Sequence, residues 1–570
     1  MRKRWLVEDA KVDLNKVEKL QKKLNCPKFI AEYLIKKGIC KKDNANKFFH
    51  PKFSHLHDPL LFKDIDKAIV RIFKAIDNGE KILIYGDYDV DGTTATSILL
   101  MGLDELGGEV DFYIPNRMVE GYGLSPEGNK TILERDIDLV VTVDCGINAV
   151  KEVEALNKNG VDVIITDHHT PQKIIPKALA VLDPKLDDAT YPYSELSGSG
   201  IAFKLLHGLF IKKNKTDDIK KYLDLAGFGT IADIVPLNGE NRTLATLGIK
   251  QLERRKNLGL QHLMKFCGLK TKTIKSSDVV FRLAPRINAA GRLSSADKAV
   301  ELMTSVYPEP AEFLARSIHM ENQRRQQIDQ TTFQRACDLI DAKYQNLDEV
   351  YFIVLASEDW HPGVVGIVAS KIVEKYNRPT ILITIDEGEG CGSGRSIRNF
   401  NIFKCLQHFK DDLISFGGHK YAAGLSILPE YIDKFEEEIN RYAKSAISAE
   451  DIAPQIRISS QLKLKTIDTD FINWLKLLAP FGPSNMNPVF MTKNVKIIGY
   501  PYTVGTNHLK MKVGKENHIL NLIGFNMGEL APSLKKGSSV DIVYSLEENI
   551  WQNKSRIQGK LKDIRPHNGY

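Results

Sequence analysis

The sequence predicts an α/β protein with two α/β domains, a long helix between them and a small β-barrel after the second. Three observations predict this fold class. From about residue 80, short apolar strands alternate with helical patterns, as they do along a parallel sheet. One long polar helical pattern runs from 309 to about 347, and a second strand–helix alternation follows it. From about 455, short alternating strands replace the helices.

The composition indicates an ordinary soluble protein. Charged residues make up 26% of the 570 residues and hydrophobic residues 43%, which is typical of globular domains. The net charge of +7 permits a nucleic-acid partner without arguing strongly for one. Seven scattered cysteines without a CxxC pair indicate reduced thiols and no structural zinc. Since the sequence shows neither a signal peptide nor an apolar run of membrane length, we expect a cytoplasmic protein that does not enter a membrane.

We divide the chain into five predicted regions. Residues 1–75 form a helical, basic segment, whose charges are typical of a solvated face and receive no chemical role. The other regions are a first α/β domain at 76–305, a bridging helix at 306–347, a second α/β domain at 348–450 and the barrel at 451–570. The bridging helix is predicted because its polar middle, ENQRRQQIDQ, cannot be buried on all sides.

Three aspartates follow the first predicted strand of the first domain. The apolar run 82–85 is typical of a buried strand, and Asp87, Asp89 and Asp91 come directly after it, before a helix that Thr93 can cap. Carboxylates this close repel one another unless a cation lies among them. An EF-hand loop is excluded because a strand precedes the aspartates and the required Glu is replaced by isoleucine. A hairpin is excluded because a helical pattern follows.

Two further strands end in the same way. The predicted strand at 138–143 ends at Asp144, and the predicted strand at 161–166 ends at the sequence Asp-His-His, 167–169. Each ending alone could be a turn or a structural histidine pair. Because the carboxyl ends of parallel strands lie at one edge of the sheet, three such endings together favour a metal site. Asp233 lies in the apolar stretch 225–236; we favour a fourth metal carboxylate there, with a helix cap or backbone turn as the alternative.

Three later stretches suit an anionic ligand. The sequence FRLAPRINAAGRL, which begins at Phe281, holds three arginines among small residues, and the arginines suit either phosphate or a buried carboxylate partner. In the second α/β domain, GSGRSIR (392–398) and FGGHKYAAG (416–424) are predicted as glycine-rich loops. Their backbone N–H groups could surround an anion, with Arg395 and His419 adding charge. Glycine-rich loops are weak signals on their own.

The C-terminal strands predict an OB-type barrel. Five short strands are expected, with one helical stretch, 527–534, between the third and the fourth. Lys510, Lys512, Tyr500 and Tyr502 could provide charge and stacking for a single nucleic-acid strand. A purely structural barrel is the alternative.

The predicted ligands favour hydrolysis assisted by metal ions. Aspartates with one or two histidines and no thiolate suit Mg²⁺ or Mn²⁺. Several carboxylates can hold two ions about 4 Å apart, which activate water for phosphoryl displacement. No nucleotide-triphosphate loop is recognisable in the sequence, so we expect hydrolysis by water without a covalent intermediate.

Four ordered motifs resemble those of the DHH phosphoesterase superfamily: GDYDVDG (86–92), VDCG (143–146), DHH (167–169) and GTIAD (229–233). The arginine-rich and glycine-rich stretches resemble the RecJ family of single-strand-specific exonucleases, including its DHHA-type second domain. FGPSNMNPVF (481–490) looks like the sequence that leads into the OB domain of that family. The resemblance covers nearly the whole chain after about residue 75.

The resemblance implies a 5′→3′ exonuclease that degrades single-stranded DNA to mononucleotides with two Mn²⁺ or Mg²⁺ ions in recombination and repair. It implies metal binding by Asp89, Asp91, Asp144, His168 and Asp233. It implies catalytic roles for His169, at the scissile phosphate, and Asp87. The residues that would hold the strand are Arg286, Asn288, Arg292, Ser393, Arg395, Ser396, Gly418 and His419. The implied partners are single-stranded DNA, a single-strand-binding protein and a RecQ-type helicase, and the implied state is a monomer.

One position departs from the family pattern. Many relatives carry a histidine ligand four residues before Asp89, where this sequence has Tyr85; Asp87 could compensate. The chain ends soon after the barrel, so we expect no extra C-terminal domain. Two alternatives remain open: a phosphodiesterase of the same superfamily acting on short oligonucleotides or cyclic dinucleotides, and a replication scaffold that binds DNA without catalysis.

Overall fold

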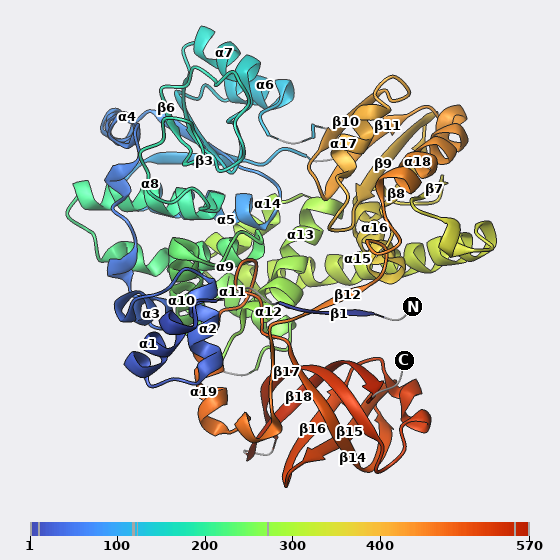
Figure 1. Ribbon diagram of the computed structural model, residues 1–570. Helices are drawn as coiled ribbons and strands as arrows, with labels where there is room; N and C mark the ends of the chain where they lie inside the picture. Colours follow the sequence, from blue (N-terminus) through green and yellow to red (C-terminus); the bar gives the residue numbers. More distant parts are fainter. Residues whose placement is uncertain are drawn as a thin grey trace. The chain divides into compact units, whose positions relative to one another are not determined.

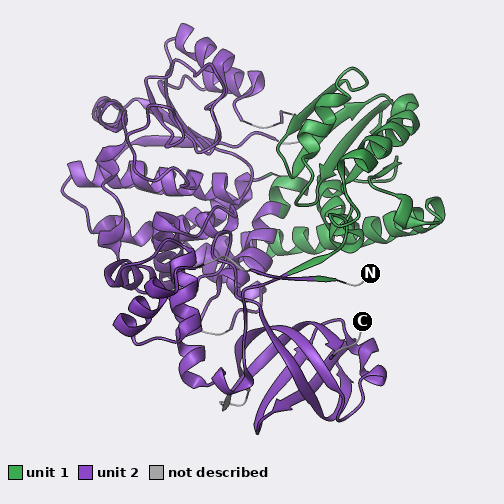
Figure 2. Ribbon diagram, in the orientation of Figure 1, with its two compact units in different colours: residues 1–4, 289–295, 316–456 green, residues 5–288, 296–315, 457–570 purple. Residues whose placement is uncertain are grey.

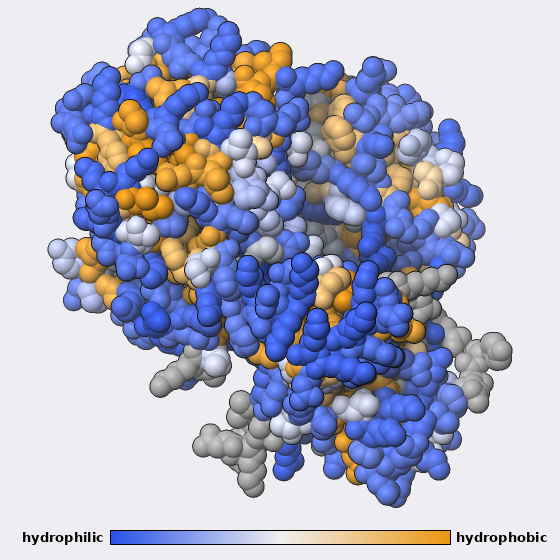
Figure 3. Space-filling view, turned by 60° about the vertical axis from the view of Figure 1, so that its left-hand side comes forward, coloured by the Kyte–Doolittle hydropathy of each residue, from blue (hydrophilic) through white to orange (hydrophobic). Residues whose placement is uncertain are grey.

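The structure is a computed structural model that describes residues 3–8, 12–116, 120–121, 123–270, 273–293, 295–551 and 554–567 (Figure 1). The chain divides into two compact units (Figure 2). The larger unit comprises residues 5–288, 296–315 and 457–570, and the smaller one comprises 1–4, 289–295 and 316–456. On the face drawn in Figure 3, hydrophilic residues predominate and apolar patches are scattered among them. Among the described helices, none is both long enough and apolar enough to cross a bilayer.

The first sheet is fully parallel, with the strand order β3-β2-β4-β5-β6. Its central strands are buried on both faces because their residues are almost all apolar. The predicted parallel-sheet domain is therefore confirmed. The strands are β2 (Lys81–Tyr85), β3 (Glu109–Tyr113), β4 (Leu139–Val143), β5 (Asp162–Thr166) and β6 (Ala180–Leu182), and the helices between them are α5 (Val90–Glu105), α6 (Pro126–Glu134) and α7 (Val150–Lys158).

Helices α8, α9 and α14 of the larger unit pack against α5, which is buried along most of its length. The helices of this unit that lie outside the sheet connections include α4 (Ile65–Asn78), α8 (Gly198–Lys212), α9 (Leu223–Ala232), α10 (Gly239–Leu252), α11 (Leu258–Phe266), α12 (Ser276–Asp278) and α14 (Asp297–Thr304). The arginine-rich stretch lies in a short π-helical segment (Val279–Leu283) and in α13 (Ala284–Leu293), which begins in the larger unit and ends in the smaller one.

The long helix that the sequence predicts is α15 (Pro308–Lys343), a single helix of 36 residues. It begins in the larger unit and ends in the smaller one. Its polar middle is not solvated all round, because Asn322, Arg325 and Asp329 are buried along one face. Asp329 pairs with Lys371 at 2.7 Å. The buried face of this helix is therefore formed by polar residues in its middle and by apolar residues on either side.

The second sheet is mixed, with the order β10-β11-β9-β8-β7. Only β7 and β8 run parallel, and the other neighbours are antiparallel. The strands are β7 (Ile353–Ser357), β8 (Thr380–Asp386), β9 (Glu389–Arg395), β10 (Ser415–Gly418) and β11 (Ala422–Ile427), and the helices are α16 (Pro362–Tyr376), α17 (Ile402–His408) and α18 (Ile432–Ala446). The expected second α/β domain is confirmed.

The prediction that the glycine-rich stretches of this domain are loops is wrong. Residues 392–395 belong to β9, and most of 416–424 belongs to β10 and β11. Since β9 lies between β8 and β11, its backbone N–H groups serve the sheet instead of an anion. The glycines serve packing: a Cβ on Gly394 would lie 2.6 Å from Ile402 Cδ1 on α17.

The C-terminal strands form the predicted OB-type barrel. Pairing runs through β14, β15, β16, β18 and β17 and returns from β17 to β14, which closes the barrel. A 3-10 segment (Gly528–Ser533) lies between the third and fourth of these strands, as expected. The strands are β13 (Ser460–Gln461), β14 (Phe490–Val504), β15 (His508–Lys515), β16 (His518–Gly524), β17 (Ser539–Trp551) and β18 (Lys554–Pro566), preceded by β12 (Gln455–Ile458) and α19 (Thr469–Leu477).

The N-terminal helices share a hydrophobic core with the barrel. These helices are α1 (Leu14–Leu24), α2 (Lys28–Lys36) and α3 (Lys42–Phe49), which follow the short strand β1 (Arg4–Val7). Phe29 of α2 lies edge-on to Phe490 of the barrel, with ring centroids 4.9 Å apart, and both belong to one buried cluster. Buried Arg242 on α10 donates to the backbone oxygens of Phe48 and Ala479. The division of the chain at residue 75 stays a prediction.

Candidate metal centre

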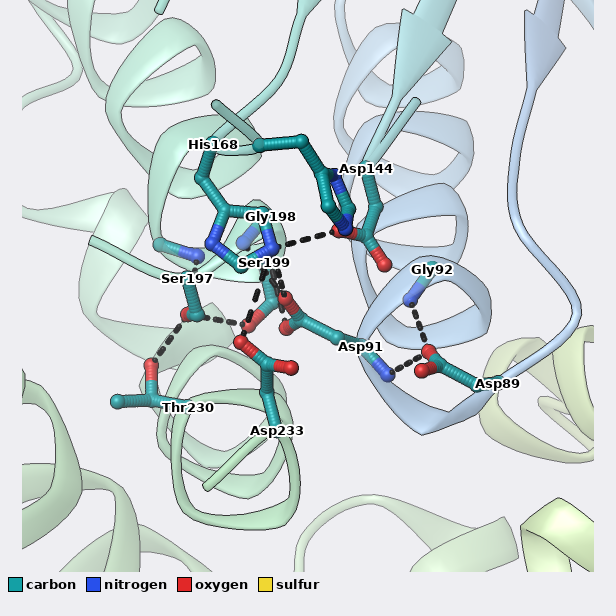
Figure 4. A network of polar contacts seen from close by, with 12 residues as sticks. Asp89, Asp91, Gly92, Asp144, His168, Ser197, Gly198, Ser199, Thr230 and Asp233 are labelled. Atoms are coloured by element: carbon teal, nitrogen blue, oxygen red, sulfur yellow. Dashed lines mark hydrogen bonds and ion pairs between the residues drawn. The ribbon is translucent and has the colours of Figure 1, made fainter. Parts of the chain in front are cut away.

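The three aspartates of the first motif surround the start of α5. Asp89 is the N-cap, and its Oδ1 accepts hydrogen bonds from the backbone N–H of Asp91 at 2.8 Å and of Gly92 at 3.1 Å (Figure 4). The cap is therefore Asp89 and not Thr93, which the sequence suggests, and the helix begins at Val90. Because a cap binds the first free N–H groups of a helix, Asp89 also fixes the direction of the loop.

Asp91 lies against the N-terminus of α8. Its two oxygens accept from Gly198 N at 2.6 Å and Ser199 N at 3.0 Å (Figure 4). The positive end of the helix dipole favours a carboxylate there. Burial and the neighbouring Asp89 nevertheless raise the pKa of Asp91 to about 6. The fully buried carboxylate thus needs more positive charge than the helix provides.

The start of α8 was not recognised as part of the site from the sequence. Ser197 caps this helix through Gly200 N at 3.1 Å, and its hydroxyl lies 2.9 Å from Thr230 Oγ1 on α9. A Cβ on Gly198 would lie 2.6 Å from Asp144 Oδ1, so only glycine allows the helix end to approach both aspartates. The one signal in the sequence is the Gly/Ser-rich turn directly before a helical pattern.

Asp144 follows β4 and faces His168. Its Oδ1 lies 3.0 Å from His168 Nε2 (Figure 4), and its backbone has the positive φ of 60° that non-glycine residues seldom adopt. Burial, followed by repulsion from Asp91 and Asp89, raises the pKa of Asp144 well above its ordinary value. Strained backbone of this kind concentrates at functional sites.

The Asp-His-His motif after β5 separates into two roles. His168 points at the carboxylates, and burial together with His169 lowers its pKa to about 3, so its ring is neutral at neutral pH and has one nitrogen without a proton, as a metal ligand requires. Asp167 instead accepts from His169 Nδ1 at 2.7 Å and from Ile147 N at 2.9 Å. Although burial opposes it, the contact with Asp167 raises the pKa of His169. Asp167 thus orients His169.

Asp233 follows the last residue of α9 and turns its side chain toward the same volume. Its Oδ2 lies 3.7 Å from His168 Nε2 (Figure 4) and is buried without a hydrogen-bond partner among the described residues. Burial, followed by repulsion from Asp91 and Asp89, raises the pKa of Asp233 well above its ordinary value. A buried carboxylate oxygen that lacks a hydrogen-bond partner and lies beside other carboxylates is a suitable ligand for a cation.

The side chains form three overlapping groups that could each hold an ion, and two of these groups share no member. In each group, one ligand atom per residue lies within 4.8 Å of the others. The groups are Asp87, Asp89 and Asp144, and Asp91, His168 and Asp233; Asp144 and His168 also group with His169. Carboxylate oxygens with one imidazole fit Mn²⁺ or Mg²⁺. The roles of the individual residues stay predictions.

Tyr85, at the position of the family histidine, points away from these groups. It is fully buried in the core beneath the sheet, and its hydroxyl donates to Gly123 O at 3.1 Å. Asp87 lies buried in the first group instead. That Asp87 compensates for the missing histidine stays a prediction.

The residues expected to hold the strand are found in both units. In the larger unit, Arg286 donates to Arg282 O, and Asn288 Oδ1 accepts from Val90 N at 3.1 Å. In the smaller unit, Arg292 donates to Gly363 O at 3.3 Å in the first turn of α16. Arg395 donates to Ser393 Oγ at 3.2 Å.

The remaining strand-holding candidates also lie in the smaller unit. Ser396 donates to Phe400 O at 2.9 Å. Gly418 ends β10, and His419 begins the turn to β11, with its N–H bound to Ala422 O at 2.7 Å. Ser396 is thus engaged by the protein itself, whereas the imidazole of His419 projects from an exposed turn.

The chain matches three known domain families in the order in which its own domains occur. Residues 81–230 match the DHH family, N-terminal domain. Residues 349–445 match the DHHA1 domain, and residues 458–563 match the RecJ OB domain. These matches agree with the two sheets and the closed barrel.

Similar proteins cover nearly the whole chain. The single-stranded-DNA-specific exonuclease RecJ of Bacillus subtilis (strain 168) is 40% identical over 98% of this chain and 70% of the relative. The protein of the same name from Haemophilus influenzae is 32% identical over 88% of this chain and 90% of the relative. The crystal structure of RecJ in complex with Mn²⁺ from Thermus thermophilus superposes with a TM-score of 0.84 and 31% identity, covering 100% of this chain and 80% of that one. The chain belongs to the RecJ family of single-stranded-DNA-specific exonucleases.

Proposed function

We propose that this protein hydrolyses single-stranded DNA from its 5′ end to mononucleotides, using two Mn²⁺ or Mg²⁺ ions, in DNA recombination and repair. The observation that carries the proposal is the pair of three-residue ligand groups that share no member, Asp87–Asp89–Asp144 and Asp91–His168–Asp233. Solved RecJ structures from Thermus thermophilus are described in complex with Mn²⁺ and with Mg²⁺, which supports the same choice of ion here.

The first group would hold one ion and the second group the other. When bound, the pair of ions activates water and stabilises the charge that develops on the phosphate. Asp91 is kept in place by the N-terminus of α8, and Asp144 by the strained turn after β4. These contacts pre-orient the carboxylates, so that little reorganisation is needed when ions and substrate arrive.

His169 would contact the scissile phosphate. It lies beside the metal groups and receives its orientation from Asp167, which accepts from Nδ1. The contact leaves Nε2 of the protonated ring as a donor, and the raised pKa of His169 increases the protonated fraction near neutral pH. A charged donor to a non-bridging phosphate oxygen is stronger than a neutral one.

Arg286, Arg292, Ser393, Arg395, Ser396, Gly418 and His419 would hold the strand, and Asn288 could add its amide N–H₂ group. Arg292, Ser393 and Arg395 belong to the smaller unit, where Arg292 and Arg395 offer guanidinium donors that suit phosphate. On the barrel, the outward side of β14 and β15 exposes Tyr500 and Tyr502 beside Lys510 and Lys512. Exposed aromatics next to lysines suit stacked bases and backbone charge.

Digestion of end-labelled DNA tests the proposal. Single-stranded and duplex oligonucleotides labelled at the 5′ or the 3′ end are incubated with Mn²⁺, with Mg²⁺ or with chelator. We expect mononucleotide release from single strands only, first from the 5′ label, and none with chelator. Cleavage confined to dinucleotides or cyclic dinucleotides would support a small-substrate phosphodiesterase instead, and binding without cleavage would support a scaffold.

Protein partners stay predictions from family membership. A single-strand-binding protein and a RecQ-type helicase are the expected partners, and a monomer acting in the cytoplasm is the expected state. Co-purification with each purified candidate and the molar mass in solution would test them.

A further inference from the structure

We propose that Asn288 is a positioning residue of the metal centre: its side-chain oxygen completes the N-terminal cap of α5 and thereby fixes Asp89 and Asp91. The proposal rests on the proposed function, since it takes these aspartates as metal ligands. It assigns to Asn288 a role toward the metal loop that is separate from contact with the DNA strand.

The hydrogen bonds at the start of α5 leave one donor for Asn288. The first N–H groups of a helix have no partner within the helix. Asp89 Oδ1 binds two of them, on Asp91 and Gly92. The remaining N–H of this turn belongs to Val90, and it donates to Asn288 Oδ1 at 3.1 Å across 198 residues of chain. The cap is therefore shared between the motif and a distant helix.

The shared cap holds one peptide unit at both ends. The carbonyl oxygen of Asp89 accepts from Thr93 N at 2.9 Å and from Thr93 Oγ1 at 2.7 Å. The N–H of the same peptide, on Val90, is held by Asn288. Because a peptide unit is planar, bonds at its C=O and its N–H set the orientation of the whole plane. This plane joins Asp89 to Val90, directly before Asp91, so its orientation constrains the backbone from which both side chains start, while the N-terminus of α8 holds the carboxylate of Asp91 itself.

The chemistry of the contact distinguishes the two roles of Asn288. Holding Val90 N–H requires an acceptor, which the amide oxygen provides. Holding a DNA phosphate requires a donor, which only the amide nitrogen provides. Asparagine can do both, aspartate only the first, and leucine of similar size neither. The three side chains therefore separate positioning from strand contact.

Binding of Mn²⁺ to the full chain without DNA tests the proposal by calorimetry. We expect Asn288→Ala and Asn288→Leu each to bind Mn²⁺ about fivefold more weakly, as loss of one cap hydrogen bond predicts. Asn288→Asp keeps the acceptor and should bind at least as tightly as the wild type. The matched control is Asn257→Ala, which removes the amide cap of α11 at Leu260 N, outside the site; its Mn²⁺ affinity should equal that of the wild type.

The outcomes separate this inference from the function on which it rests. Wild-type-like Mn²⁺ affinity of Asn288→Ala overturns the positioning role, as does equal weakening by Asn257→Ala or by Asn288→Asp. Absence of Mn²⁺ binding by the wild type overturns the proposed function itself. Fluorescence anisotropy of an oligonucleotide with chelator present supplies the second readout: unchanged affinity of Asn288→Ala supports positioning, and a loss there with intact Mn²⁺ affinity assigns the residue to the strand alone.

Discussion

In the sheet β3-β2-β4-β5-β6 the motif residues follow the strands, whereas in the sheet β10-β11-β9-β8-β7 the motif glycines lie within them. In the first sheet, Asp87, Asp144 and His168 lie beyond the strand ends, and the parallel order brings them together. In the second sheet, Gly392 and Gly394 lie within β9, where their lack of a side chain allows Leu425 and Ile402 to pack closely.

The difference shows what a sequence motif can indicate. A charged residue directly after a buried parallel strand has one plausible location, the carboxyl edge of the sheet, so its neighbours can be predicted. A glycine has no side chain, and the same glycine-rich sequence serves a loop, a tight turn or a crowded strand. Charged motifs therefore predict a site, whereas glycine motifs predict only that space is scarce or that a turn is needed.

Replacing a charged residue at the first edge should have the largest effect. Asp144→Ala removes a member of the first ligand group, and we expect cleavage of single-stranded DNA to fall at least about a thousandfold, beyond the ten- to hundredfold typical of outer partners. The matched control is Asp138→Asn at the opposite end of β4, where the carboxylate accepts from Lys81 N. With saturating Mn²⁺, the control should cleave at the wild-type rate. Equal losses of rate in both variants would mean that the carboxyl edge of the sheet has no special role in cleavage.

The metal-free site should lose stability as pH rises. The folded protein raises the pKa of Asp91 to about 6 from 3.8, so it binds the proton more tightly than the unfolded chain does. The free energy of unfolding therefore falls between about pH 4 and pH 6, and above that range it is lower by up to about 3 kcal/mol than below it. In chelator, Asp91→Asn should unfold at higher urea than the wild type at pH 7.5 and at equal urea below about pH 4. A constant difference across this range would contradict the link to Asp91.

Crowding the helix that supports Asp91 should weaken the site without removing a ligand. A Cβ on Gly198 would lie 2.6 Å from Asp144 Oδ1, so Gly198→Ala should displace that carboxylate and lower activity about ten- to hundredfold. Gly208→Ala on the same helix meets the flexible end of Ile69 at 3.0 Å and Ile65 at 3.6 Å, and it serves as the control. Mn²⁺ titrations of both variants check the result, and an unaffected Gly198→Ala would show that the contact is loose.

A glycine of the second sheet should affect stability and not metal binding. Gly394→Ala would place a Cβ 2.6 Å from Ile402 Cδ1, and overpacking of this kind destabilises by about 1–3 kcal/mol. Gly417 on β10 has no atom within 4 Å of such a Cβ, so Gly417→Ala should be tolerated. Urea unfolding compares the two variants. A loss of Mn²⁺ affinity in Gly394→Ala would remove the contrast between the two sheets.

Arg395 should have the smallest effect, on binding of the strand. Arg395→Ala removes one expected phosphate contact, which should weaken DNA binding a few-fold and reduce the slope of log affinity against log salt by about 1. Arg441→Ala on α18, where the arginine pairs with Glu437 on the surface, is the control. An unchanged slope for Arg395→Ala would show that this residue does not contact the strand.

The sequence by itself determined the parallel sheet, the long helix, the barrel and the acidic and imidazole groups at the strand ends. Strand burial and the acids after Tyr85, Val143 and Thr166 are local properties, and a parallel sheet leaves them one edge to share. From the sequence, Asp233 could be proposed as a metal ligand only because the groups at the three strand ends would need a further ligand.

Only the tertiary structure decided which distant groups support that edge. Asp91 depends on the N-terminus of α8, and Val90 on Asn288 of α13. The two histidines of the Asp-His-His motif also differ only in the folded protein: His168 lies against Asp144, whereas His169 is oriented by Asp167. The physical reason is that a hydrogen bond between a side chain and a remote backbone N–H leaves no periodic trace in the sequence, since any backbone N–H can be its donor.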